Sequence, residues 1–558
     1  MGVCTSTHHK TRIHKSSYST THKRTFTSNT TTCKKTKTYD SSTSTKHSSS
    51  LSFPSLENDY KHKDNEHLYT CSKYFIKENN EMPTNKYRII SKIGEGSFGN
   101  VYYSKNIATN QTVAIKKIHK AEYNKIDNLD IDNEITILKK LSHPNIIKIY
   151  EYYSTGNSFY IINEYCEHGE LFKKIQMDFN ENQIAFMAYQ IISAVLYLHE
   201  KGIMHRDIKL ENILINHIEV NPCTNREYYW LKLIDFGGSK MINKEQRETN
   251  MVGTTYYVAP EVLTKNYNYK CDCWSIGVIL YMLVTGVAPF EGKNKDELVN
   301  AIKKGSYNKS NKLLISKSKE LQDLINQLLE IDVSTRLSAE EALSHPFFKK
   351  IISFPFQLSQ SLNNNSCIID SFFKNLLSFK CKNKFIEMVL CFLSHNISMK
   401  EQEIEMSKMF FHLNCKGNGK ITKSEFEEGM KHYININENI TSYINELFEY
   451  LNDNNNEYME YEQFMMGWLK KEIVLNDDYL KYAFVFFDRN NKGVITNEDL
   501  IYAFNTYTKC VGKKRNDVNK EEIVINILKE IDEENKGNID YTKFKQIMSN
   551  YFQVFQML

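Results

Sequence analysis

A glycine-rich turn, Gly94-Glu95-Gly96-Ser97-Phe98-Gly99, lies between two strand-like runs, Tyr87–Ile93 and Val101–Asn106. Glycine has no Cβ, so a hairpin that contains it lets the backbone approach phosphate oxygens that a side chain would block. Dinucleotide-binding folds have the same glycine spacing, and the turn alone leaves both fold classes open. The residues that follow must decide between them.

The next strand-like run ends on a lysine that can bind phosphate. Val113-Ala114-Ile115-Lys116 places a cation at the end of this run, and Glu134 lies in the following helical run, Asn133–Leu141. A carboxylate at this spacing can hold the lysine side chain in place beside a nucleotide. The pair therefore favours a fold that handles phosphate through a lysine rather than a dinucleotide-binding fold.

Three further motifs follow in a fixed order: His205-Arg206-Asp207-Ile208-Lys209-Leu210-Glu211-Asn212, Asp235-Phe236-Gly237 and Ala259-Pro260-Glu261. With the glycine-rich turn and the lysine-bearing strand they make five motifs, and residues 87–348 resemble the eukaryotic protein kinase family. Lys209 and the pair Gly253-Thr254 are typical of serine/threonine kinases. The resemblance implies an α+β bilobal kinase fold that uses ATP and Mg²⁺.

The resemblance also implies catalytic roles, in which positioning and charge neutralisation supply most of the rate. Asp207 is expected to accept the hydrogen bond of the substrate hydroxyl, and Lys209 to neutralise charge on the transferred group. Asn212 and Asp235 are expected to hold Mg²⁺, a hard cation that prefers oxygen ligands.

The nucleotide site follows from the same resemblance. Lys116 is expected to clamp the α- and β-phosphates, while Glu164 and Cys166 offer backbone groups to adenine and Asn163 is the gatekeeper. The full expected set is Ile93, Gly94, Glu95, Gly96, Ser97, Gly99, Val101, Ala114, Lys116, Glu134, Glu164 and Cys166.

Other residues have supporting roles by the resemblance. Asp272 is expected to brace the catalytic loop, and Glu261 to pair with Arg336. Glu170 matches the acidic residue with which basophilic kinases recognise an arginine on the substrate, although it also fits a solvated glutamate at a helix end. Protein substrates with basic motifs are therefore expected.

The activation segment carries Thr249 and Asn250 where related kinases place a phosphothreonine or an acid that pairs with Arg206. Two departures from the family pattern are mild: Leu210 replaces a proline, and Gly238 follows the Asp-Phe-Gly motif. A non-catalytic scaffold is the alternative, and the complete catalytic set disfavours it.

The C-terminal part contains an internal repeat of four segments that resemble EF-hands. Position eight of each loop is hydrophobic, and these residues (Ile421, Met459, Ile495 and Ile539) are expected to pair as short strands. Four units make an all-α pair of lobes, 401–470 and 478–550. The loops are Asn414–Glu425, Asn452–Gln463, Asp488–Asp499 and Asp532–Lys543.

None of the four loops has the complete set of calcium ligands, which are oxygen donors at alternating positions and a bidentate Glu at position 12. A lysine in the loop removes an oxygen and adds a like charge. The third loop, with Asp488, Asn490 and Asp499, is the leading candidate despite Lys492, and the first loop follows. The second and fourth are expected to be structural, so calcium as a ligand stays open.

The segment 349–400 is expected to be a linker followed by a junction helix. Apolar residues recur at helical spacing between Phe372 and Leu393, with lysines among them. Such a helix can be the target of a calmodulin-like lobe, a membrane-surface helix or ordinary core packing. Its place directly before four EF-hand units favours the first.

Kinase, basic junction and two EF-hand lobes together resemble the calcium-dependent protein kinases of plants and apicomplexan parasites, over residues 87–550. In that family the junction is autoinhibitory, and calcium-loaded lobes remove the block. The degenerate loops leave an alternative, a calcium-insensitive kinase whose lobes are a structural or docking module.

Residues 1–80 are predicted to be a disordered tail, because half of the first 50 are Ser or Thr and their apolar surface is small. Gly2 fits a myristoylation signal, Cys4 can be palmitoylated, and nearby lysines and arginines can meet anionic lipid. An unmodified tail is the alternative. With 71 basic and 67 acidic residues the chain does not indicate nucleic acid, and the expected location is cytoplasmic, peripheral at membranes.

Overall fold

The structure is a computed structural model. Every described residue belongs to one unit of the chain, Lys63–Leu558. Gly2, Cys4 and Ser97 lie outside the described residues, as do residues 452–457 of loop two, residues 532–536 of loop four and most of the predicted linker. The described ranges are 75–96, 99–123, 131–222, 224–243, 246–350, 384–397, 400–431, 458–469, 471–508 and 537–554, with single positions in 441–448.

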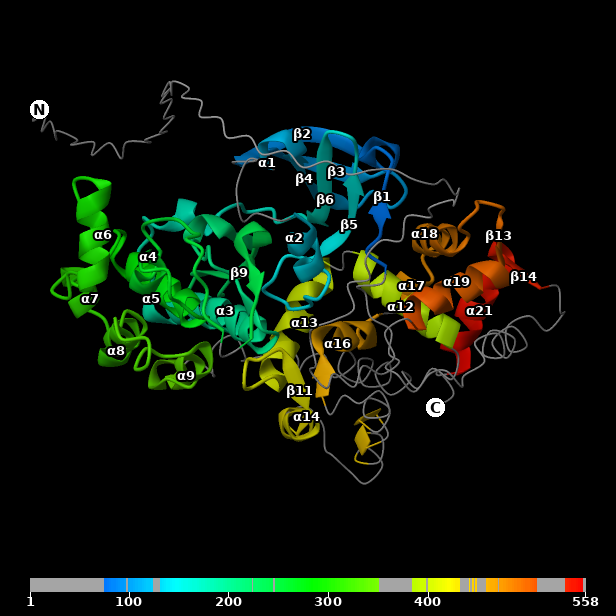
Figure 1. Ribbon diagram of the computed structural model, residues 1–558. Helices are drawn as coiled ribbons and strands as arrows, with labels where there is room; N and C mark the ends of the chain where they lie inside the picture. The colour runs from blue at the N-terminus through cyan, green and yellow to red at the C-terminus, as the bar shows by residue number, and fades with distance from the viewer. Residues whose placement is uncertain are drawn as a thin grey trace, which may run out of the picture. The chain divides into compact units, whose positions relative to one another are not determined.

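The small lobe is built on a six-stranded sheet with the order β1-β5-β6-β4-β3-β2 (Figure 1). All neighbouring strands are antiparallel except β1, which pairs parallel to β5 with Glu78 opposite Tyr152. The prediction of a disordered tail to residue 80 is therefore wrong for this segment. The elements are β1 Glu78–Asn79, β2 Tyr87–Gly96, β3 Gly99–Asn106, β4 Thr112–His119, α1 Lys120–Tyr123, α2 Ile131–Leu138, β5 Ile149–Ser154 and β6 Ser158–Glu164.

The large lobe is mostly helical, and its centre is formed by α3 and α5. Helix α3 begins with a capping box between Asn180 and Gln183, which satisfies two backbone N–H groups at its start. Every residue of α5 after Lys270 is buried, as expected for a core helix. The elements are α3 Glu181–Glu200, β7 Ile203–Met204, β8 Ile213–Val220, β9 Glu227–Leu233, β10 Lys240–Met241, α4 Pro260–Leu263, α5 Lys270–Thr285, α6 Lys295–Lys304, α7 Lys312–Ile315, α8 Lys319–Leu328 and α9 Ala339–Leu343.

The C-terminal lobes each contain a two-stranded sheet. Ile421 lies opposite Met459 and Ile495 opposite Ile539, so the predicted pairing of the position-eight residues is confirmed. No described helix is long and apolar enough to cross a bilayer. The elements are α12 Lys384–Asn396, α13 Lys400–Leu413, β11 Lys420–Thr422, α14 Lys423–Met430, β12 Tyr458–Glu460, α16 Tyr461–Gly467, α17 Lys471–Val474, α18 Asp477–Phe487, β13 Val494–Thr496, α19 Asn497–Thr508, β14 Asn538–Asp540 and α21 Tyr541–Val554.

Short 3₁₀ turns complete the described chain: η2 Pro83–Asn85, η3 Leu171–Lys174, η4 Leu210–Asn212, η5 Phe236–Gly238 and η6 Pro346–Lys350. Two of them coincide with catalytic motifs. Turn η4 ends on Asn212, and η5 begins directly after Asp235, whose backbone is left-handed (φ 65°).

Helix α12 is the part of the predicted junction that the structure describes, and its apolar face is buried among the EF-hand helices. The Phe385 ring lies 5.5 Å from the Phe487 ring, and the Phe392 ring lies 4.3 Å from the Phe486 ring. Met388, like both phenylalanines on α12, is at most 1 % exposed. This helix therefore shares one hydrophobic core with the EF-hand helices.

Candidate active site and calcium loops

Lys116 connects the small lobe to the Asp-Phe-Gly motif. Its Nζ lies 2.8 Å from Glu134 Oε1 on α2 and 2.8 Å from Asp235 Oδ1. Burial alone would lower the pKa of Lys116, but the two carboxylates raise it above the ordinary lysine value. Lys116 in turn lowers the pKa of Asp235 to about 2. The lysine is thus charged and held between α2 and the Asp-Phe-Gly motif.

The catalytic loop brings Asp207, Lys209 and Asn212 together. Asp207 Oδ2 accepts hydrogen bonds from Lys209 Nζ (2.5 Å) and Asn212 Nδ2 (3.0 Å). Asp207 Oδ1 accepts from the backbone N (3.0 Å) and Oγ1 (2.9 Å) of Thr254. The carboxylate is therefore oriented by four donors, and Lys209 also donates to Thr254 Oγ1 (3.0 Å).

Asp272 on α5 braces the catalytic loop, as predicted. Its Oδ2 accepts from the His205 backbone N (3.0 Å), and its Oδ1 accepts from the Arg206 backbone N (2.9 Å). Arg206 has a left-handed backbone (φ 68°), which is unfavourable for a long side chain. The buried carboxylate compensates by holding the two successive N–H groups.

The acid that pairs with Arg206 is Glu248, one residue before Thr249. Glu248 Oε2 lies 3.7 Å from Arg206 Nη1 and 2.5 Å from Lys240 Nζ. The prediction that Thr249 or Asn250 occupies this place is wrong by one position. Backbone hydrogen bonds between Glu248 and Tyr267 set the direction of the segment, and this long-range pairing is not visible in the local sequence.

The glycine-rich hairpin is formed by β2 and β3, with Gly96 opposite Gly99. A Cβ at Gly99 would lie 1.8 Å from the Lys117 carbonyl oxygen, so this position requires glycine. On β3, Val101 lies opposite Lys116, which brings the hairpin beside the lysine. Of the expected nucleotide set, Ile93 and Glu95 are exposed, Cys166 and the side chains of Glu134 and Glu164 are buried, and Gly94, Val101 and Ala114 are half-buried.

Glu164, a member of the expected nucleotide set, ends β6, and its backbone N donates to the Lys148 carbonyl (2.9 Å). Glu170 precedes η3, and its backbone pairs with Leu214 of β8. The segment that joins β6 to η3 (164–170), called the hinge below, is thus held at its start by Lys148 and at its end by β8.

The third EF-hand loop is closed by Asp488, which is buried and accepts from the backbone N of Lys492 (2.9 Å) and Gly493 (2.7 Å). Asp499 is 2 % exposed; its Oδ2 accepts from Thr496, whereas its Oδ1 has no hydrogen-bond partner among the described residues. Asn490 is exposed. One buried, unpartnered carboxylate oxygen at position 12 fits a cation, even though no group of three acidic, His or Cys residues converges in the described chain.

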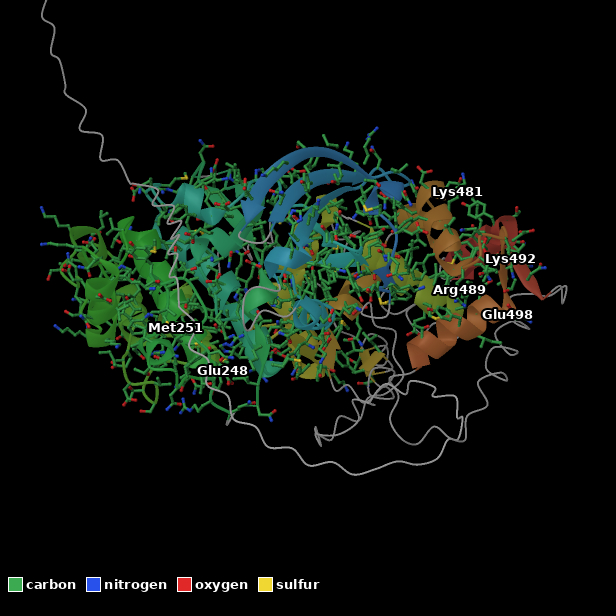
Figure 2. All side chains as sticks on the ribbon, turned by 45° about the horizontal axis from the view of Figure 1, so that its top comes forward. Glu248, Met251, Lys481, Arg489, Lys492 and Glu498 are labelled. Atoms are coloured by element: carbon green, nitrogen blue, oxygen red, sulfur yellow. The ribbon has the colours of Figure 1, made fainter. Side chains whose placement is uncertain are left out.

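The third loop itself carries further charged side chains. Figure 2 labels Arg489, Lys492 and Glu498 on the second lobe. Two of the three are cations at loop positions 2 and 5, and they reduce the negative potential that attracts Ca²⁺.

In the first EF-hand loop, protein contacts hold the carboxylate at position 12, whereas both polar side-chain atoms of Asn414 at position 1 are buried with no hydrogen-bond partner among the described residues. Both Glu425 carboxylate oxygens accept hydrogen bonds, Oε1 from Cys415 Sγ (3.3 Å) and Oε2 from Thr422 Oγ1 (2.7 Å). Outside the loop, Ser193 Oγ on α3 donates to the Gly417 carbonyl (2.7 Å), and Lys420 pairs with Glu200 (2.8 Å). The spacing of the loop residues gave no indication of this contact with the kinase domain.

Comparison with known proteins agrees with this architecture. A protein kinase domain model matches residues 87–348, and an EF-hand domain pair model matches 477–549. Calcium-dependent protein kinase 5 of Plasmodium falciparum (isolate 3D7) is 35% identical over 480 residues, which cover 84% of this chain and 79% of that protein. Calcium-dependent protein kinase 4 of the same organism is 30% identical over 486 residues (85% and 88%). Calcium-dependent protein kinase 22 of Oryza sativa subsp. japonica is 31% identical over 473 residues (83% and 77%). The chain therefore belongs to the calcium-dependent protein kinase family and is a serine/threonine protein kinase.

Proposed function

We propose that this kinase transfers the γ-phosphate of ATP to serine or threonine with Asp207 as the group that orients the substrate hydroxyl. The observation that carries the proposal is the assembled pair of ion networks, Lys116 with Glu134 and Asp235, and Asp207 with Lys209. Family members need both parts at once, because the lysine–glutamate pair and the metal-binding aspartate must be in place together.

The remaining residues of the site have complementary roles. Asn212 and Asp235 provide oxygen donors that fit Mg²⁺, which would neutralise charge on the phosphates when bound. Lys116, kept charged by its carboxylates, would bind phosphate oxygens. Lys209 lies between Asp207 and Thr254, where a cation can neutralise charge on the transferred group.

Substrate preference rests on Glu170, whose backbone is fixed by pairing with β8. A carboxylate on a backbone that is fixed in this way can receive an arginine of the substrate through a charged hydrogen bond. Protein substrates with a basic motif are therefore the proposed class.

Regulation is proposed to act through the lobes that surround α12. The apolar face of this helix is buried among the EF-hand helices, and its described contacts with the kinase domain lie behind the hinge (Lys148 Nζ to the Ser394 carbonyl, 3.1 Å). Lobes that hold the junction helix in this place keep it from serving as an inhibitor of the cleft. The calcium-dependent relatives favour this proposal over a calcium-insensitive docking module.

Asp488→Ala is expected to abolish the calcium-stimulated part of peptide phosphorylation and leave activity in chelator unchanged. The third loop has the fitting oxygen at Asp499 but carries Lys492, so we expect a dissociation constant weaker than about 10⁻⁵ M. Calorimetric titration of the full chain with Ca²⁺ measures this. Asp488→Asn, which keeps a hydrogen-bond acceptor without the charge, should also weaken binding, and Asp478→Asn on the preceding helix should not. Four sites of micromolar affinity would contradict the ligand argument.

Membrane attachment is proposed from Gly2 and Cys4. Gly2→Ala is expected to move most of the protein from the membrane to the supernatant fraction, because one myristoyl chain together with a second signal is what gives stable anchoring. Fractionation of cells that express each variant measures the distribution. Cys4→Ser should give a partial shift, and an unchanged distribution of Gly2→Ala would sink the proposal.

A further inference from the structure

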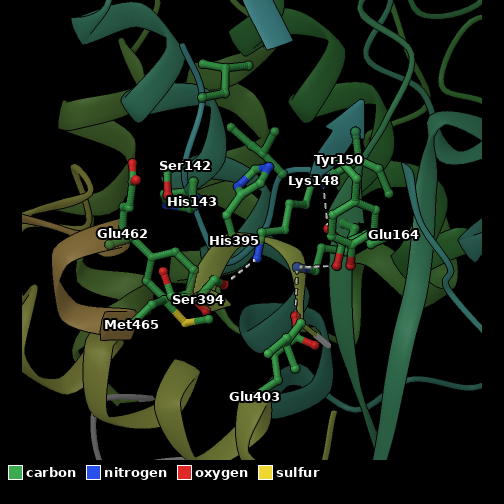
Figure 3. A pocket seen from close by; sticks show the side chains of 16 residues that line it. Ser142, His143, Lys148, Tyr150, Glu164, Ser394, His395, Glu403, Glu462 and Met465 are labelled. Atoms are coloured by element: carbon green, nitrogen blue, oxygen red, sulfur yellow. Dashed lines mark hydrogen bonds and ion pairs between the residues drawn. The ribbon is translucent and has the colours of Figure 1, made fainter. Parts of the chain in front are cut away.

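A buried group of charges lies behind the hinge, where the kinase domain meets the first EF-hand lobe (Figure 3). Lys232 on β9 is 5 % exposed, and its Nζ lies between two carboxylates. Glu164 Oε2, at the end of β6, is 3.0 Å away, and Glu403 Oε1, on α13, is 2.9 Å away. One lysine of the catalytic domain thus joins the hinge to a helix of the lobe.

Lys148 adds a second connection to the same place. Its backbone N donates to Glu164 Oε1 (2.7 Å), so both carboxylate oxygens of Glu164 are held, one by Lys148 and one by Lys232. The Lys148 side chain donates to the Ser394 carbonyl of α12 (3.1 Å), as Figure 3 shows. The position of Glu164 is therefore determined from its side chain as well as from its strand.

The charge balance of this group depends on Glu403. Two lysines, Lys148 and Lys232, face two carboxylates, Glu164 and Glu403. Burial alone would raise the pKa of Glu403, but Lys232 holds it below the ordinary value, so the carboxylate is ionised. Lys148 also feels Glu462, which lines the same cavity, but without Glu403 the remaining carboxylate paired with Lys232 would be Glu164, in a poorly hydrated place where an unbalanced charge is costly.

Glu164 is also where this group meets the nucleotide site, because the resemblance to protein kinases implies, and we propose, that the backbone of Glu164 and Cys166 contacts adenine. We propose that Glu403 is a positioning residue for ATP: when the first lobe docks, its carboxylate fixes Lys232, which fixes Glu164 and the backbone that contacts adenine. The lobes then control nucleotide affinity in addition to access to the cleft. This inference rests on the proposed adenine contacts.

A simpler role for Glu403 is to attach the lobe, and the same helix offers a matched control for it. Lys408, also on α13, pairs with Glu219 of β8 at 2.6 Å, and this pair does not involve the hinge. Loss of either pair removes one ion pair between α13 and the kinase domain, whereas only loss of the Glu403 pair acts on Glu164.

The test compares steady-state kinetics of Glu403→Gln and Lys408→Gln at saturating calcium. We expect Glu403→Gln to raise KM for ATP by about five- to tenfold, the range for one charged hydrogen bond acting through a neighbour. KM for peptide and kcat should stay within about twofold of the wild-type values, because residues that are far from a site usually change it by no more than this. Lys408→Gln should leave KM for ATP at the wild-type value.

A second pair of variants follows the connection through Lys232. Lys232→Gln should raise KM for ATP at least as much as Glu403→Gln, and the double variant should not exceed Lys232→Gln, because both act on one contact. Thermal unfolding of each variant checks that the fold is intact.

Two outcomes would overturn the inference: an unchanged KM for ATP in Glu403→Gln, or an equal rise in Lys408→Gln, which would leave docking alone as the role. Calorimetric binding of Mg·ADP gives the same comparison without turnover. If the wild-type protein failed to phosphorylate peptide, the proposed function would fall, and the ADP affinities of the two variants would still decide the role of Glu403.

Discussion

Replacing Asp207 with asparagine is expected to lower kcat for peptide phosphorylation by about 10³-fold, within the range that a positioned acid–base group contributes. The carboxylate accepts hydrogen bonds from Lys209, Asn212 and both donors of Thr254. The asparagine amide has the same shape as the carboxylate, but an NH₂ donor replaces one of the two acceptor oxygens. This donor would face the donors of Lys209, Asn212 and Thr254. The substrate hydroxyl would lose the group that orients it.

KM for ATP should change little in this variant, because Asp207 makes no described contact with Lys116 or Glu134. Steady-state kinetics at saturating ATP and calcium measure kcat, and thermal unfolding checks that the domain is intact. Asp296→Asn, an exposed residue in the first turn of α6, serves as the matched control and should retain full activity. Activity of Asp207→Asn close to that of the control would remove Asp207 from the catalytic assignment.

Local motifs predicted the kinase fold well because each motif combines a backbone requirement with a chemical one. Gly99 must lack a Cβ beside the Lys117 carbonyl, and Lys116 must lie opposite Val101 to reach Glu134. Such requirements act within a strand or a turn, so they leave a pattern at fixed spacing. The position-eight residues of the EF-hand loops are predictable for the same reason.

The features that the sequence did not reveal depend on contacts between distant segments. Glu248 is selected over Thr249 by a backbone pairing with Tyr267, and strand β1 exists because it adds to the edge of β5. Lys232 and Glu403 belong to different domains, and neither lies in a recognisable motif. Tertiary context of this kind overrides local propensity and pattern.

The buried pair of Glu261 and Arg336 links the end of the activation segment to the base of the large lobe. Arg336 is fully buried and donates through Nη1 and Nη2 to the two Glu261 oxygens; the Nη2 bond is 2.9 Å. Its Nε donates to the Glu330 carbonyl (2.8 Å), and the guanidinium lies over the Trp274 ring at 5.0 Å. The N–H groups of the guanidinium thus have acceptors, and two of the nitrogens bind the two oxygens of Glu261. A lysine cannot make such a bidentate contact.

Arg336→Met is expected to lower the free energy of unfolding of the kinase domain by about 3–5 kcal/mol, since it leaves the Glu261 carboxylate buried without its cation. Denaturant unfolding followed by tryptophan fluorescence measures the change, because Trp274 lies directly under the guanidinium. The double variant Glu261→Met with Arg336→Met removes both charges and should be more stable than Arg336→Met alone. If the losses of unfolding free energy were additive in the double variant, packing and not the unpaired carboxylate would be the cause of the destabilisation. The control is Lys92→Gln, which breaks an exposed pair with Glu95 and should leave the unfolding midpoint unchanged.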